Sequence, residues 1–236
     1  MAISLRLAST SLVGLLLLTA GCGSPAPAPP ITAGGSSAPV PSTPPPSSAT
    51  PAAPSTAPSG SASAGVVVGP APADLRQVDW AATPFPGDFC DVPGLVRQGS
   101  SEEVRENSRT WGRVHLNQYG HMAYGDVDGD GRDEAAMPVS CDNGGGTASG
   151  QLVFGYVVFG RSPAGLVALG SLTPRQQPSG VAATRMGGVV LTSRRATVTE
   201  HWYRPEDATC CPRGRATTVW TFEGDHVSPG SPSITS

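Results

Sequence analysis

The chain has 236 residues, and its first 73 residues carry almost no charge and a large share of the 25 prolines. About 160 residues therefore remain to form a hydrophobic core, which is the size of one ordinary domain. Fifteen arginines, no lysine and eighteen acidic residues give a formal net charge of -3. Because this balance has no basic excess to neutralise phosphates, we expect no nucleic-acid partner.

The amino terminus has the pattern of an export signal. A start whose only charged side chain is Arg6 is followed by an apolar run at Leu12–Leu18 and then by small residues before Cys22. The apolar run is too short to cross a bilayer core of about 30 Å as a stable helix, which disfavours a retained transmembrane anchor. We predict a signal peptide over residues 1–21.

The small residues that end at Cys22 resemble a bacterial lipobox, with Thr19 where an aliphatic residue is commoner. The resemblance implies cleavage before Cys22 and acylation of its sulfur and amino group. Two or three acyl chains give stable membrane attachment, whereas one chain gives only marginal binding. We therefore expect a lipoprotein anchored to the outer face of the cell membrane. A plain cleavable signal is the alternative.

Residues 22–73 combine the lipidated cysteine with a linker of Ala, Pro, Ser, Thr and Gly that contains no charge and only one short apolar run, Val66–Val68. Such a composition cannot bury enough apolar surface to offset the entropy of ordering, so we predict disorder. In extended polyproline geometry the linker would reach on the order of 100 Å. It would serve as a spacer within a cell wall or simply as a solubilising segment.

Residues 74–228 show short apolar runs of period two, broken by Gly, Pro and Asp, which predicts a single all-β domain. Leu152–Phe159 has apolar residues at both its odd and its even positions, so it should be a central strand covered on both faces. Ala196–Tyr203 should be half exposed. Ser101–Arg109 is the only segment expected to be helical, and residues 229–236 are expected to be a disordered tail. The other expected strands are Val114–Leu116, Met122–Tyr124, Ala135–Val139, Leu166–Leu172, Val181–Thr184, Val189–Thr192 and Thr217–Phe222.

Four further cysteines fit an exported protein, because pairing is expected in an oxidising compartment. We favour a disulfide between Cys90 and Cys141, which would stabilise the fold by about 4 kcal/mol in the chain-entropy model. This leaves Cys210 and Cys211 as a neighbouring pair. The alternative joins one of these two to Cys90 or Cys141. Zinc is not expected, because there is no Cys-x-x-Cys spacing.

The segment from Asp126 to Glu134 carries the pattern of a calcium loop. Asp126, Asp128, Asp130 and Glu134 stand at positions one, three, five and nine, and a glycine stands at position six. Ca²⁺ takes six to eight oxygen ligands, and the glycine permits the sharp turn that directs the next carbonyl, that of Arg132, to the ion. An EF-hand is excluded, because position twelve is methionine and both flanks are predicted strands. A metal-free acidic turn is the alternative.

The stretch from Tyr124 to Gly160 resembles the calcium loop of FG-GAP and VCBS-type repeats, in which one strand ends in the Asp run and two further strands follow. The resemblance implies Asp126, Asp128 and Asp130 as side-chain ligands of Ca²⁺, Arg132 through its carbonyl, and Glu134 where the family more often has Asp. Because the loop occurs only once, it cannot supply the blades of a propeller. We predict an antiparallel sandwich or an open barrel instead.

The order of lipobox, Pro-Ala-Ser-Thr tether, one Asp loop and a late Cys-Cys-Pro turn also resembles a loose class of actinobacterial exported lipoproteins. No Gly-x-Ser-x-Gly, His-Glu-x-x-His or Walker motif is present. We therefore expect a non-enzymatic β module with a structural calcium ion and a partner in the cell wall or envelope. The alternative is a wall or polysaccharide hydrolase that uses Asp or Glu residues outside any recognisable motif.

Overall fold

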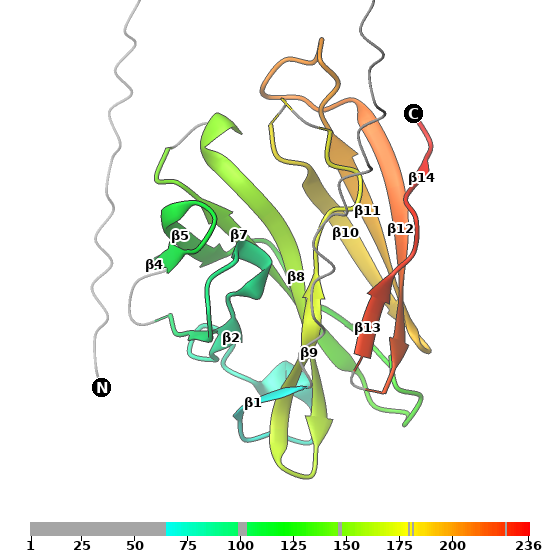
Figure 1. Cartoon of the computed structure of the whole chain (residues 1–236). Helices are drawn as coiled ribbons and strands as arrows, with labels where there is room; N and C mark the ends of the chain where they lie inside the picture. Colours follow the sequence, from blue (N-terminus) through cyan, green and yellow to red (C-terminus); the bar gives the residue numbers. More distant parts are fainter. Residues whose placement is uncertain (1–64, 99–102, 146–147, 179, 181, 225) are drawn as a thin grey trace, which may run out of the picture. The chain divides into compact units, whose positions relative to one another are not determined.

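A computed structural model describes residues 65–236 except 99–102, 146–147, 179, 181 and 225 (Figure 1). The predicted signal peptide, Cys22 and the linker as far as residue 64 lie outside these described residues. The described part consists of antiparallel strands with three short 3₁₀ turns, η1 (Leu75–Gln77), η2 (Asp88–Cys90) and η3 (Ala148–Gly150). The all-β prediction is confirmed.

The strands form two main sheets. The first is curled and has the order β1-β9-β8-β7-β5-β4, with β6 paired to β7; the second has the order β10-β11-β12-β13, with β14 paired to β12. The first sheet contains β1 (Val66–Gly69), β4 (Glu103–Ser108), β5 (Gly112–Gln118), β6 (Ala123–Gly125), β7 (Glu134–Asp142), β8 (Gln151–Ser162) and β9 (Gly165–Leu172). The second contains β10 (Arg185–Thr192), β11 (Arg195–Trp202), β12 (Gly214–Glu223), β13 (His226–Pro229) and β14 (Ser233–Ile234), and a separate small pair joins β2 (Phe85–Pro86) to β3 (Leu95–Val96).

Strand β8 lies between β7 and β9 and contributes to two hydrophobic cores. Val157 and Phe159 point into a core shared with the segment from η1 to β3, whereas Tyr156 and Val158 point into a core shared with the second sheet. Successive side chains of a strand face opposite sides, so the apolar run fills both cores at once. The prediction of a central strand covered on both faces is confirmed.

Strand β11 has one buried face and one more open face, as predicted. Ala196, Val198 and Glu200 are fully buried, whereas Thr199 is exposed. The buried face packs in the core between the sheets, beside Trp220 and Phe222 of β12. The two sheets are thus held together mainly by apolar burial, at about 1.5 to 3 kcal/mol for each large side chain.

The predicted helix at Ser101–Arg109 is wrong over the residues that the structure describes, because Glu103–Ser108 is strand β4. It pairs with β5 in register from Glu103 opposite Asn117 to Ser108 opposite Gly112. Val104 packs against the first core. Glu103 and Arg105 occupy exposed positions of this edge strand, where charges discourage pairing with other chains.

Three further expectations fail where tertiary pairing overrides local sequence. Val66–Gly69, placed in the disordered linker, forms β1 against the edge of β9. In the tail, Ser233–Ile234 pairs with β12, and Thr235 and Ser236 donate backbone hydrogen bonds to the carbonyl of Arg215. Residues 182–184 of the predicted strand Val181–Thr184 are not in a strand, because Thr184 is held by Gln176 and Gln177.

Both predicted disulfides are present. Cys90 of η2 is joined to Cys141 of β7, and both residues are completely buried in the first core. Cys210 and Cys211 are joined to each other in the exposed connection between β11 and β12. The first bridge therefore ties the N-terminal segment to the central sheet, whereas the second closes a ring between neighbours.

The two bridges should differ strongly in their effect on stability. Replacing Cys90 and Cys141 together by serine should lower the free energy of unfolding by about 4 kcal/mol, because that bridge closes a loop of 51 residues. The same double replacement at Cys210 and Cys211 is the matched control and should cost much less, since no long loop is released. Urea unfolding measures both variants. Equal losses would contradict this account.

Candidate metal centre

The Asp loop is the connection between β6 and β7. Gly125 pairs with Glu134 at the base of the hairpin, so residues 126–133 project beyond the first sheet. Gly129 and Gly131 have φ values of 84° and 82°, a region that L side chains rarely adopt. The glycines in the pattern thus meet a conformational need of the turn.

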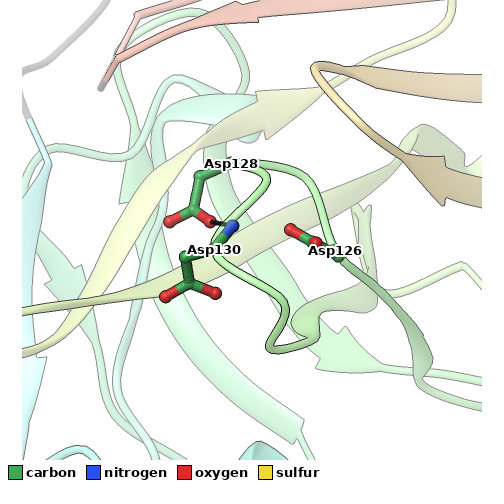
Figure 2. A group of neighbouring side chains, drawn as sticks. All are labelled: Asp126, Asp128 and Asp130. Carbon is green, nitrogen blue, oxygen red and sulfur yellow. Dashed lines mark hydrogen bonds between the residues drawn. The ribbon is translucent and has the colours of Figure 1, made fainter.

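Asp126, Asp128 and Asp130 are brought together by this turn (Figure 2). Each offers a carboxylate oxygen that lies within 4.8 Å of the corresponding oxygens of the other two. Asp126 is half-buried, and the other two are exposed. This group could hold a metal ion, and its three members are the three aspartates that the sequence indicated as side-chain ligands.

The same carboxylates also hydrogen-bond the loop backbone. Asp126 accepts from the amides of Gly129 at 2.6 Å and Gly131 at 3.0 Å, and Asp128 accepts from the amide of Asp130 at 3.0 Å. These bonds belong to the acidic turn considered above as the metal-free alternative. They leave Asp126 and Asp128 able to bind a metal ion, because each oxygen of these two carboxylates accepts at most one of these bonds and keeps a free lone pair.

Arg132 reaches the group through its side chain. Its Nε donates to Oδ2 of Asp130 at 2.8 Å, its second guanidinium nitrogen donates to the same oxygen, and its backbone amide donates to Oδ1. These bonds hold the pKa of Asp130 below its usual value. The proposed ligation through the Arg132 carbonyl stays a prediction.

Glu134 lies outside the three-aspartate group and braces the loop from within. Its side chain is 1% exposed, and Oε2 accepts hydrogen bonds from the backbone amides of Val127 at 2.8 Å and Asp128 at 3.3 Å. Its other oxygen lies 3.5 Å from the guanidinium of Arg161 without a hydrogen bond. Burial raises the pKa of Glu134. The structure thus gives Glu134 a contact with the loop backbone, and its predicted ligation of the ion stays a prediction.

Asp133, the neighbour of Glu134 in the sequence, makes its contact outside the three-aspartate group. Its Oδ2 accepts a hydrogen bond from Arg76 of η1 at 2.6 Å. Arg76 in turn lies 4.6 Å from the ring centre of Tyr124 in β6. Asp133 therefore ties the loop to the N-terminal segment and not to the other aspartates.

The loop is fastened to the second sheet as well. The carbonyl of Val127 accepts a hydrogen bond at 2.7 Å from the amide of Arg194, in the turn between β10 and β11. Val127 itself is 1% exposed and belongs to the core between the sheets. At Gly125 the backbone approaches so closely that a Cβ would lie 2.4 Å from the carbonyl oxygen of Leu191. The Asp loop thus lies at the junction of the two sheets.

Glu200 is the polar residue that interrupts the apolar face of β11. It is completely buried, and it accepts hydrogen bonds from the amides of Arg175 and Gln176 and from the hydroxyl of Thr218. A buried polar group needs such partners. Its carboxylate therefore fastens the segment before β10 to the second sheet.

Searches against protein-family models, curated proteins and solved structures find no match for this chain. None of the helices in the described part of the chain is both long and apolar enough to span a membrane. The resemblances to calcium-loop repeats and to exported lipoproteins therefore stay predictions.

The role assigned to Glu134 can be tested by two replacements. Glu134→Ala removes the acceptor of two loop amides and should lower the free energy of unfolding by about 2 to 4 kcal/mol, because buried N–H groups lose their partner. Glu134→Gln keeps an acceptor oxygen and should retain most of the stability. Urea unfolding of both variants measures the difference. If alanine were no worse than glutamine at this position, the bracing role would be wrong.

Proposed function

We propose that this protein is a lipid-anchored β module of the cell envelope whose Asp loop binds a structural Ca²⁺ ion. The observation that carries the metal assignment is the convergence of Asp126, Asp128 and Asp130 within 4.8 Å. Hard cations prefer carboxylate and carbonyl oxygens, and Ca²⁺ tolerates the irregular geometry of a flexible loop better than Mg²⁺ does.

The position of the loop supports a structural role for the ion. The loop contacts the second sheet through Val127 and Gly125 and the N-terminal segment through Asp133. An ion that neutralises three neighbouring carboxylates would remove their mutual repulsion at this junction. We therefore assign the ion to stabilising the sheet junction and propose no catalytic step for it.

The proposed location rests on the amino-terminal sequence. The apolar run, the small residues before Cys22 and the uncharged linker suit a folded module held at a distance from the membrane. Such a module would present its surface to a partner in the cell wall or envelope. We propose no enzymatic activity for this module.

Removal of calcium should destabilise the protein. With free Ca²⁺ at about 100 times its dissociation constant, the melting temperature of the full chain should exceed that in chelator by about 5 to 10 °C. The double variant Asp126→Asn, Asp128→Asn should lose this difference. Asp133→Asn is the control, since it lies in the same loop but pairs with Arg76, and it should keep the difference. Identical melting of the wild-type chain in both buffers would contradict the calcium assignment.

Replacement of Cys22 tests the anchor separately. In a bacterial host, the full chain should sediment with membranes and incorporate a labelled fatty acid, whereas Cys22→Ala should do neither. The acyl chains supply the attachment, because each buried CH₂ group contributes about 0.8 kcal/mol. Cys210→Ala with Cys211→Ala is the control and should remain membrane-bound and labelled. Equal labelling of the Cys22→Ala variant would refute acylation at this residue.

A further inference from the structure

A cavity of about 400 Å³ lies where β10, at the edge of the second sheet, meets the first sheet. Its volume is within the range of about 300 to 1,000 Å³ that is usual for small-molecule sites. The cavity is remote from the Asp loop, because it lies at the start of β10, whereas the loop contacts the end of that strand. The residues that line it are Tyr119, Ser140, Ala148, Gln151, Phe154, Arg185 and Met186.

One wall of the cavity is aromatic and apolar. The rings of Tyr119 and Phe154 pack edge to face, with their centres 5.4 Å apart and an angle of 75° between their planes. Met186 of β10 is almost completely buried and belongs to the core between the sheets. A flat or ring-shaped ligand could pack against this wall, as aromatic side chains do with one another and with the faces of sugars.

Three polar groups of the cavity have no partner within the described residues, whereas the hydroxyl of Ser140 donates a hydrogen bond to the side chain of Asn117. Arg185 is exposed and makes no ion pair or hydrogen bond there, and the side chain of Gln151 likewise has none. The hydroxyl of Tyr119 is buried and lacks a hydrogen-bond partner in the described part. Burial raises the pKa of Tyr119, so this hydroxyl keeps its proton and can donate. An unsatisfied buried group of this kind is uncommon and calls for an explanation.

The charge around the cavity favours an anion. Arg185 is the only charged residue among the described residues that line it. Arg185 stands opposite His201 of β11, and His201 stands opposite Arg215 of β12, so two arginines lie on either side of this histidine in the second sheet. Burial and the two arginines lower the pKa of His201, so the guanidinium groups carry the positive charge. A planar guanidinium matches the geometry of a carboxylate and can bind it through two parallel hydrogen bonds.

We infer that this cavity binds a small ligand in which a carboxylate is attached to a ring, either a sugar acid or an aromatic acid. Arg185 binds the carboxylate, Tyr119 donates a hydrogen bond to an oxygen of the ligand, and the ring packs against Phe154. The inference is independent of the proposed calcium ion and lipid anchor. It explains why Arg185 and the Tyr119 hydroxyl lack partners at the same cavity.

Titration calorimetry of the full chain, with Ca²⁺ present and ionic strength fixed, tests this inference. The probes are glucuronate and benzoate, with glucose and benzyl alcohol as their neutral counterparts. At least one carboxylate should bind at least about tenfold more tightly than its neutral counterpart, which is the effect of a charge-assisted hydrogen bond. Binding of glucuronate would indicate a sugar acid as the ligand, and binding of benzoate would indicate an aromatic acid. Absence of binding by both at about 10 mM, or equal binding of the neutral probes, would overturn the inference.

Variants connect the binding to named residues. Arg185→Gln should weaken carboxylate binding by about tenfold, whereas Arg195→Gln, a matched change of an exposed arginine at the other end of the β10–β11 hairpin, should not. Tyr119→Phe should weaken binding without lowering the melting temperature, because it deletes a buried hydroxyl that has no partner. Equal losses in the two arginine variants, or full affinity in Tyr119→Phe, would contradict the assigned contacts.

Discussion

The burial of β7 and β8 on both faces is the constraint on which the rest of the structure depends. All nine residues of β7 are buried, and the alternating residues of β8 serve two different cores. Neither face of such a strand is exposed to water. The N-terminal segment therefore covers one face, and the second sheet covers the other face. The disulfide from Cys90 to Cys141 reinforces the first of these contacts.

Two buried carboxylates attach loops to the two sheets. Glu134 at the start of β7 and Glu200 in β11 each accept two backbone amide hydrogen bonds from a neighbouring loop. Such carboxylates replace the water that the amides would otherwise bind, and they hold the loop in one conformation. The Asp loop is positioned by the first of them. The three aspartates therefore project from a turn whose inner side is filled by the side chain of Glu134.

The two candidate sites lie at opposite ends of β10, and each is found where the two sheets meet. The Asp loop contacts Leu191 and Arg194 near the end of the strand, whereas the cavity includes Arg185 at its start. At both ends of β10, loops and strand edges can present polar groups to a ligand, because the core between the sheets supplies the stability of the fold. The two sites differ in charge, one acidic and one basic, which suits a cation and an anion respectively.

The sequence by itself determined the all-β class, the central place of Leu152–Phe159, both cysteine pairs and the three converging aspartates, because these depend on period-two patterns, cysteine parity and loop spacing. Tertiary structure decided the rest. Glu103–Ser108 became a strand and Val66–Gly69 and Ser233–Ile234 became ordered because free strand edges were available to them. The burial of Glu134 against the loop backbone, and the cavity that Arg185 and Tyr119 line together, were not foreseen, because burial and partners from distant segments are not encoded in local spacing.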